Sequence, residues 1–462
     1  LLQPVLRLGP RGHLQSRIHI CYAPLLHLKI PDDIKKKKVI MVSEKAHASS
    51  RIFYGWYVMA ASFFLLFFQS GARYSFGIMF KPMMAEFGWN RASISSVFFL
   101  NMVFFALTLT VAGRLYDRYG PRWVIFSSTV LLAAGYMCTA LVRTLWQFHI
   151  FYGVLTAIGT GGATIPLVAA LISKWFEKRR GLTISLALSG ACLGQFILVP
   201  IFNQFVLIYS WRISYFLIGL IILVVNTILA FTVIKGDPDD LGVQPYGRAD
   251  SENRVDPDGS VNSVHSESDL NLKQAMKTYS LWLFLVFMFI CGGGDFLIVA
   301  HLVPFVTDYG VSPTSAANML ALFGLMSLGG ILIAGPASDL IGNKIPIAAS
   351  FVLRLLLFVM ILKYRIPISF YIFAGGFGFT FLITAPLTAT LAGRLYGFAH
   401  LGLISGFITT IHHLGGGFWA YTGGLLFDRT GNYQIILAVS AVLAAIATIC
   451  AIAIKEKRHL IR

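Results

Sequence analysis

The sequence contains two related stretches, GRLYDRYGPR at residues 113–122 and GPASDLIGNK at residues 335–344. Each stretch directly follows a long apolar run. Glycine, an acid, glycine and a base recur in both at the same spacing, 222 residues apart. The matching positions are Gly113, Asp117, Gly120 and Arg122 in the first copy, and Gly335, Asp339, Gly342 and Lys344 in the second. This duplication predicts a chain built from two related halves.

The composition around these stretches is strongly apolar. Of the 462 residues, 56% are hydrophobic and 12% are charged, and the mean hydropathy is +0.73. A soluble domain carries roughly 25% charged residues. A chain with too few polar residues to cover its surface is stable where that surface faces lipid. The composition therefore disfavours a large soluble protein and predicts an integral membrane protein.

A helix needs about 20 mostly apolar residues to cross a bilayer. Windows of that length predict twelve spans, six on each side of one polar stretch. They lie near residues 54–78, 92–113, 122–142, 146–172, 181–208, 212–234, 280–306, 314–337, 345–363, 367–392, 401–426 and 434–454. We expect an all-α polytopic membrane protein, with two pseudo-symmetric six-helix bundles around a central cavity.

The predicted domains follow from these spans. The bundles occupy residues 51–234 and 278–456, and the polar, charged stretch at 235–277 is expected to be a solvated, mobile linker. Residues 457–462 form a tail. Residues 1–50 are expected to be an extension, disordered or partly non-native, since no Met precedes Met41. A basic arm touching anionic lipid and a targeting segment are the alternatives.

The formal charge of +17 does not indicate nucleic-acid binding, because the basic residues lie mostly in short loops and at the termini. The loops after spans 2, 4, 6, 8 and 10 hold more Lys and Arg than the opposite loops, which predicts that they are cytoplasmic. Both termini then lie in the cytoplasm, and we expect a plasma-membrane protein, or an inner-membrane protein if the source is bacterial.

The five cysteines (Cys21, Cys138, Cys192, Cys291 and Cys450) are scattered singly, so neither a metal site nor a disulfide framework is indicated. The sequence also contains no phosphate-binding GxxxxGK[ST] loop, no GxSxG and no HExxH. We therefore expect no enzyme, no catalytic residue, no metal and no cofactor.

The two repeated stretches resemble the loop signature of the major facilitator superfamily, and the resemblance covers residues 51–456. Four shorter motifs resemble the branch that holds monocarboxylate porters and oxalate–formate antiporters. They are YGW at 54–56, WFEKRRGL at 175–182, SWR at 210–212 and DRTGNY at 428–433. The resemblance implies a secondary transporter with alternating access, and it implies a gating role for the repeated residues together with Arg118. A plain turn with solvated charges is the alternative for those residues.

The sequence departs from that branch at one position. Porters of the branch usually carry a carboxylate-binding arginine in span 8, where this chain reads SLGGILIAG at residues 327–335. The resemblance also implies that span 9 lies away from the cavity, so we expect Arg354 to be peripheral.

An ionisable residue inside the membrane is a candidate functional group because it is costly to bury, by at least ~2.5–3.5 kcal/mol on insertion scales. Arg73 lies in span 1, one turn from Gln69, and its planar guanidinium suits a carboxylate. A snorkelling side chain is the alternative. Asp295 follows Gly292, Gly293 and Gly294, a triplet that permits a break in span 7. We expect Asp295 to couple proton movement, or else to pair structurally with Arg73.

Histidines titrate near neutral pH, so His301, His412 and His413 are candidates for a proton relay, with plain packing as the alternative. Of these we assign His301 to proton coupling and His413 to substrate binding. Hydroxyl groups on two spans complete the predicted substrate site, namely Thr160 and Thr164 in span 4 and Thr380 and Thr384 in span 10.

We therefore expect a secondary transporter of a small organic anion, a monocarboxylate or dicarboxylate, moved with a proton or exchanged for a counter-anion. Its partners are the substrate and the lipid bilayer, without nucleic acid, and the expected functional form is a monomer. A carrier of neutral or drug-like solutes and a non-transporting sensor on the same fold are the alternatives.

Overall fold

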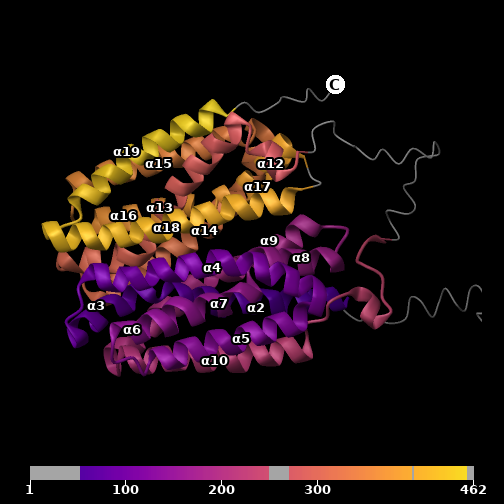
Figure 1. Cartoon of the computed structure of the whole chain (residues 1–462), viewed down its shortest axis with the longest axis horizontal. Coiled ribbons are helices and arrows are strands. Elements are labelled where there is room, and N and C mark those ends of the chain that lie inside the picture. Colours follow the sequence, from indigo (N-terminus) through magenta and orange to yellow (C-terminus); the bar gives the residue numbers. More distant parts are fainter. Residues whose placement is uncertain (1–52, 249–269, 398–399, 455–462) are drawn as a thin grey trace, which may run out of the picture. The chain divides into compact units, whose positions relative to one another are not determined.

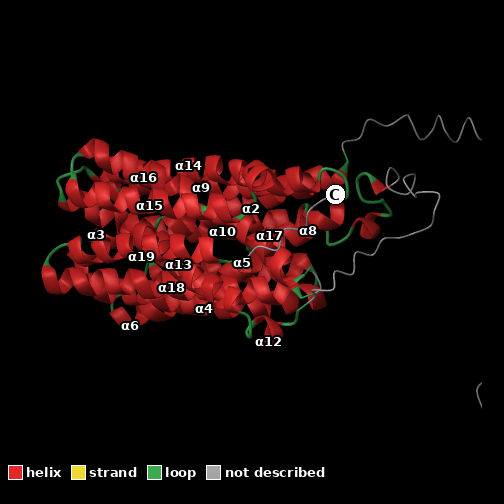
Figure 2. Cartoon of the chain, turned by 90° about the horizontal axis from the view of Figure 1, so that it is seen from above, coloured by secondary structure: helices red, strands yellow, loops and turns green. Residues whose placement is uncertain are grey.

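The computed structural model of the chain describes residues 53–248, 270–397 and 400–454, which belong to one unit beginning at Phe53. The predicted extension (1–50) and tail (457–462), together with residues 249–269 of the predicted linker, lie outside the described residues. Within the described residues every regular element is a helix (Figure 2).

Apart from two short helices in the predicted linker, Pro238–Leu241 (η3) and Leu272–Ala275 (α12), these helices form twelve rods within the described residues. They are Tyr54–Phe87 (α2 and α3), Arg91–Tyr119 (α4), Pro121–Thr139 (α5), Leu145–Trp175 (α6 to α8), Arg180–Ile208 (α9), Trp211–Thr232 (α10), Tyr279–Asp308 (α13), Pro313–Ile341 (α14), Lys344–Lys363 (α15), Pro367–Tyr396 (α16 and α17), Leu401–Thr430 (α18) and Gln434–Ala453 (α19). Ten of them are long and apolar enough to cross a membrane. The other two are the 19-residue α5 and the glycine-rich α18. The predicted all-helical fold is confirmed.

Local signals in the sequence set where several rods begin. The side chains of Asn90, Ser210, Thr278 and Ser312 each accept a hydrogen bond from the backbone N–H three residues later. Such a cap contributes ~1 kcal/mol by satisfying an N–H group that has no partner within the helix. The capped rods are α4, α10, α13 and α14.

The repeated stretches have matching backbone conformations. Gly120 ends α4 with φ 77° and ψ 165°, and Gly342 ends α14 with φ 78° and ψ 176°. Positive φ favours glycine at both positions, so the duplicated turn is real. Asp117 and Asp339 are both exposed and make no ion pair with any residue that the structure describes. We call this end of the bundle the motif end, and the opposite end the far end.

Breaks in the rods lie elsewhere than predicted. The prediction of a break at Gly292–Gly294 is wrong, because α13 runs unbroken from Tyr279 to Asp308. Instead the fourth rod changes from a π-helical turn (His149–Thr156) through α7 (Ala157–Thr160) and a tight turn (Gly161–Ala163) into α8 (Ile165–Trp175). The tenth rod breaks between α16 (Pro367–Phe381) and α17 (Thr384–Tyr396). The fourth and tenth rods are equivalent in the two halves.

The glycines of α13 serve close packing. A Cβ atom on Gly292 would collide with the carbonyl oxygen of His412 on α18, and one on Gly415 would collide with that of Phe289 on α13. Small residues that let two backbones touch are a common device of membrane helices. The glycine run therefore brings α13 and α18 together, which places Asp295 next to His412.

Part of the predicted linker is packed against the bundle, which corrects the expectation of a wholly solvated segment. The ring of Tyr246 lies against those of Phe53 and Phe176, with centroids 5.6 and 5.8 Å apart. Its carbonyl accepts hydrogen bonds from the backbone of Glu177 and Lys178. Phe53, directly before the first rod, and Phe176, directly after the fourth, thus hold this part of the linker.

The two halves lie beside each other, with α4 along α18 and α9 along α14 (Figure 1). At the far end they are joined by a group that we call the clamp, which consists of Lys81, Arg91, Asp308, Asp428 and Tyr433. Arg91 Nη2 lies 2.8 Å from Asp308 Oδ2, and Arg91 Nη1 donates to the Tyr433 hydroxyl at 2.7 Å. Lys81 Nζ lies 2.7 Å from Asp308 Oδ1. The Asp428 carboxylate accepts from the first two N–H groups of α4.

We expect Asp308→Asn to loosen the far end, because it leaves the Arg91 side chain, only 5% exposed, without its carboxylate. Removing one partner of a buried pair costs about 3–5 kcal/mol. Hydrogen exchange should rise at the start of α4 and the end of α13. Glu86→Gln is the matched control, since Glu86 binds Trp211 and Arg212 of its own half. Equal exchange in wild type and Asp308→Asn would contradict the role of the clamp.

Candidate substrate and coupling site

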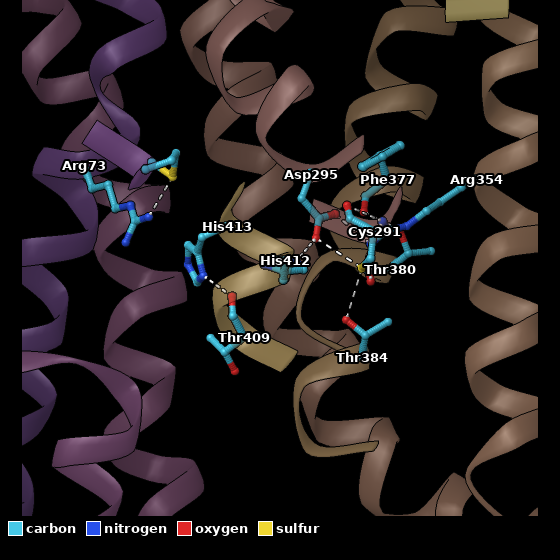
Figure 3. A network of polar contacts seen from close by, with 11 residues as sticks. Arg73, Cys291, Asp295, Arg354, Phe377, Thr380, Thr384, Thr409, His412 and His413 are labelled. Carbon is cyan, nitrogen blue, oxygen red and sulfur yellow. Dashed lines mark hydrogen bonds and ion pairs between the residues drawn. The ribbon is translucent and has the colours of Figure 1, made fainter. Parts of the chain in front are cut away.

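A row of polar side chains crosses the middle of the bundle (Figure 3). It begins at Arg73 on α2 (Tyr54–Tyr74), passes His413 and His412 on α18 and Asp295 on α13, and ends at Arg354 on α15. The row therefore runs from the first half of the chain into the second, and it joins residues that lie far apart in sequence.

Arg73 lies at the seam between the halves. Its guanidinium carbon is 4.3 Å from the ring centroid of Phe105 on α4 and 5.4 Å from that of Phe296 on α13. Its one described polar contact is from Nη2 to the sulfur of Met102 at 3.4 Å, and Nε has no hydrogen-bond partner. No carboxylate among the described residues pairs with it, so the predicted alternative of an Arg73–Asp295 pair is not found. The side chain is partly exposed.

Asp295 instead pairs with Arg354 and His412. Arg354 Nη2 lies 2.7 Å from Asp295 Oδ1, and His412 Nε2 lies 3.2 Å from Asp295 Oδ2. The side chains of Asp295 and Arg354 are 1% and 2% exposed, and that of His412 is 15% exposed. The expectation that Arg354 is peripheral is wrong for its side chain. The helix α15 packs on α16 and α19, but the guanidinium reaches inward to α13.

Thr380 and Thr384 flank the break in the tenth rod and support this ion pair. Arg354 Nε donates to Thr380 Oγ1 at 3.0 Å, and Nη2 donates to the Thr380 carbonyl at 2.9 Å. Thr384 Oγ1 lies 3.7 Å from the Cys291 sulfur. Thr380 is fully buried and faces Arg354, so its hydroxyl group lies on the far side of Asp295 from Arg73.

Cys291, Asp295 and His412 place three potential ligand atoms within 4.8 Å of one another, a spacing that a metal ion could use. The Arg354 guanidinium already contacts two of these residues, at 2.7 Å from Asp295 Oδ1 and 3.5 Å from the Cys291 sulfur. A metal cation here would stand beside a fixed positive charge. We therefore interpret the cluster as an ion-pair network and not as a metal site.

His413 faces Arg73 (Figure 3), and its assignment to the substrate site stays a prediction. Its ring centroid lies 4.8 Å from that of Phe105 and 5.4 Å from that of Phe296, the same two rings that flank Arg73. Its Nδ1 bonds to the carbonyl of Thr409 at 2.8 Å. Gln69 and Thr160 also meet, through a 3.0 Å bond from Gln69 Nε2 to the Thr160 carbonyl. Thr164 lies just after the tight turn in the same rod.

His301 belongs to a different network near the far end. Its Nδ1 lies 2.8 Å from the Tyr433 hydroxyl, and its Nε2 lies 2.8 Å from the Ala420 carbonyl and 3.2 Å from Ser95 Oγ. His301 thus links α4 to α18 and touches the clamp. It does not contact the Asp295 pair in the part of the chain that the structure describes.

The sequence placed Arg354 away from the cavity, gave Cys291 no role in the site and offered His412 only as one of three histidines for a proton relay, and it did not predict the clamp. Two signals were present. Cys291 and Asp295 are four residues apart, on one helix face, and a lone arginine in an apolar span requires a buried partner. Nothing in the sequence states which helix provides that partner.

The family model of the Major Facilitator Superfamily matches residues 62–308 and 283–460. The chain belongs to the Major Facilitator Superfamily. It is a multi-pass membrane transporter for a small-molecule substrate and not an enzyme, which confirms the expected class.

Relatives in the same superfamily include transporters of the predicted branch. An uncharacterized MFS-type transporter, YcxA of Bacillus subtilis, is 27% identical over 403 residues, which cover 85% of this chain and 93% of the relative. Monocarboxylate transporter 13 of Bos taurus is 25% identical over 84% of this chain and 86% of the relative. The oxalate:formate antiporter of Oxalobacter formigenes is 22% identical over 58% of each chain.

Solved structures agree with the fold. A bacterial homologue of the human lysosomal transporter Spinster superposes with a TM-score of 0.67 at 13% identity, over 87% of this chain and 97% of that one. The nucleoside transporter NupG gives 0.67 at 13% identity, over 86% and 99%. At this identity the likeness concerns the fold alone.

We expect Gly292→Ala to lower the melting temperature by several degrees, because its methyl group collides with the His412 backbone and forces α13 and α18 apart. Overpacking of this kind costs ~1–3 kcal/mol. Gly406→Ala on α18 is the matched control, since a Cβ there meets no atom within 4 Å. Differential scanning fluorimetry measures both variants. A melting temperature of Gly292→Ala equal to that of the control would show that the close approach does not hold the site together.

Proposed function

We propose that this transporter carries a small organic anion, and that the anion binds to Arg73. The observation that supports this proposal is the guanidinium of Arg73, which has no carboxylate partner among the described residues and is partly exposed at the seam between the halves. A permanent positive charge within the membrane is costly, by ~2.5–3.5 kcal/mol or more. An anionic substrate supplies the missing countercharge.

The geometry around Arg73 suits a carboxylate on an apolar body. The planar guanidinium binds two carboxylate oxygens side by side, while Phe105, Phe296 and Met102 offer apolar contacts. In our proposal His413 joins Arg73 in the substrate site, and the bond between Gln69 and Thr160 supports the neighbouring helix break.

The eighth rod does not supply a second cation. Between Pro313 and Ile341 the only charged side chain of α14 is Asp339, at the motif end. Recognition of the anion therefore depends on Arg73 in this chain. The names of the monocarboxylate transporters and of the oxalate:formate antiporter among the relatives refer to carboxylates, which supports the same substrate class.

We propose that transport is proton symport or anion exchange by alternating access. The coupling candidates are Asp295, within the row of polar side chains that begins at Arg73, and His301, which touches the clamp. The repeated residues Gly113, Asp117, Arg118, Gly120, Arg122, Gly335, Asp339, Gly342 and Lys344 are the proposed gate at the motif end. We place that end in the cytoplasm and the protein in the plasma membrane, as a monomer.

A second candidate function is the carriage of neutral or drug-like solutes, which the absence of charge in the middle of α14 favours. A non-transporting sensor on the same fold is the third. Uptake of radiolabelled lactate, formate, oxalate and benzoate into proteoliposomes separates these cases. A sensor binds its ligand without transporting it, and a carrier of neutral solutes takes up none of these carboxylates.

We expect Arg73→Ala to raise the apparent KM for the transported carboxylate at least about 30-fold. This factor corresponds to the loss of ~2 kcal/mol that is typical when one partner of a buried charge pair is removed. Arg73→Lys keeps the positive charge but loses the planar guanidinium that binds both carboxylate oxygens. Its KM should therefore lie between those of the wild type and Arg73→Ala.

The control for Arg73→Ala is the loss of an arginine that takes no part in the site. Arg394, at the end of α17, is unsuitable because it has contacts of its own. Arg143→Ala is suitable, since this arginine is exposed in the loop after α5. Unchanged carboxylate uptake by Arg73→Ala, at normal protein levels in the membrane, would exclude Arg73 as the anion site.

A further inference from the structure

We propose that His412 carries the coupled proton, and that Asp295 and Arg354 form a fixed ion pair that holds His412 in place. This inference rests on the proposed function, because it names the residue that couples proton movement to the anion. It gives to His412, one of the three histidines that the sequence offered for a proton relay, the part that the sequence analysis assigned to Asp295 and His301.

Arg354 holds Asp295 in its charged form. The guanidinium is fixed by its bonds to Thr380 Oγ1, to the Thr380 carbonyl and to the Cys291 carbonyl, at 3.0, 2.9 and 3.3 Å. Its only carboxylate partner among the described residues is Asp295. A proton on Asp295 would leave a guanidinium that is 2% exposed without a countercharge. A buried charge without its partner is strongly destabilising, so Asp295 stays a carboxylate throughout the cycle.

His412 is the group next to this pair that can take and release a proton. Its Nε2 lies 3.2 Å from Asp295 Oδ2, the carboxylate oxygen that Arg354 does not bind. An imidazolium at this position donates a charge-assisted hydrogen bond to Oδ2. The side chain of His412 is 15% exposed, against 1% for Asp295, so water reaches the histidine and not the carboxylate.

The other titratable and charged groups around His412 are few. The sulfur of Cys291 on α13 lies 3.5 Å from Asp295 Oδ2. The ring centroid of His413 lies 5.2 Å from that of His412. Arg73 faces His413 from α2 (Figure 3). The ring of Phe296 on α13, which does not titrate, lies 5.8 Å from that of His412.

Proton and anion binding are linked in this arrangement. The proton on His412 adds a positive charge to the row that begins at Arg73, which favours an anion there. A bound anion favours the proton in return, since coupling between two binding sites is reciprocal. One proton and one monocarboxylate together add no net charge, which lowers the cost of moving the loaded site through the membrane.

The transport test uses the full chain in proteoliposomes, with the carboxylate panel named above. We expect His412→Gln to lose pH-gradient-driven accumulation by at least about fivefold, the lower end of typical coupling factors, and to keep exchange of labelled for unlabelled substrate. His149→Gln and His400→Gln are the controls, because the ring of His149 bonds to Ser96 and to the Leu145 carbonyl and His400 is exposed directly before α18. Both variants should keep gradient-driven accumulation. Full accumulation by His412→Gln, or its loss in all three variants, would overturn the assignment.

A second measurement needs no substrate. Infrared difference spectra of the purified chain are recorded between about pH 5 and about pH 8, the range in which histidine changes charge. We expect imidazole bands that shift when the chain is grown with ring-labelled histidine and that are absent from His412→Gln. A protonated carboxyl band that disappears in Asp295→Asn would instead identify Asp295 as the proton carrier.

The two measurements separate the failure of this inference from failure of the proposed function. If wild type carries no member of the carboxylate panel, the anion function fails and the inference fails as a statement about coupling. The infrared spectra still decide between His412 and Asp295 as the protonated group. If the wild type transports carboxylates of the panel but the pH gradient does not change their uptake, the anion function stands and only the assignment of a coupled proton to His412 is excluded.

Discussion

A charge inside membrane-spanning helices is costly unless an opposite charge faces it, and this constraint separates Arg73 from Arg354, Arg91 and Arg212. Arg354 pairs with Asp295, Arg91 with Asp308 and Arg212 with Glu86. Arg73 contacts two aromatic rings and a methionine sulfur instead. The three paired arginines hold helices together. Arg122 and Arg365 donate to the backbone carbonyls of Phe231 and Leu362, whereas the one described polar partner of Arg73 is a sulfur atom, so Arg73 is left for a ligand. The proposed function follows from this difference.

The position of the pairs also suggests how the transporter changes shape. The Asp295–Arg354 pair lies within the second half, so it need not break when the halves move. The clamp lies between the halves, where Lys81 and Arg91 of the first half meet Asp308 of the second. Opening the far end must break the clamp while the central pair stays intact. His301, which joins both halves beside the clamp, lies where it can respond to that opening.

The sequence allowed the fold to be predicted well, because lipid imposes long apolar helices and because the turn residues of the repeat need positive φ at Gly120 and Gly342. The site was predicted only in part. A run of glycines permits either a break or a close contact, and the outcome at Gly292 depends on the backbone of His412, which lies 120 residues away in the chain. The direction in which Arg354 points is likewise set by Thr380 and Asp295 on other helices.

The central claim is that the free guanidinium of Arg73 is the anion site. A structure of the full chain determined with the best-transported member of the carboxylate panel tests it most directly. We expect a carboxylate within hydrogen-bonding distance of Arg73, with the Asp295–Arg354 pair unchanged. A ligand bound elsewhere, with Arg73 still in contact with Met102, Phe105 and Phe296 only, would show that Arg73 is not the anion site.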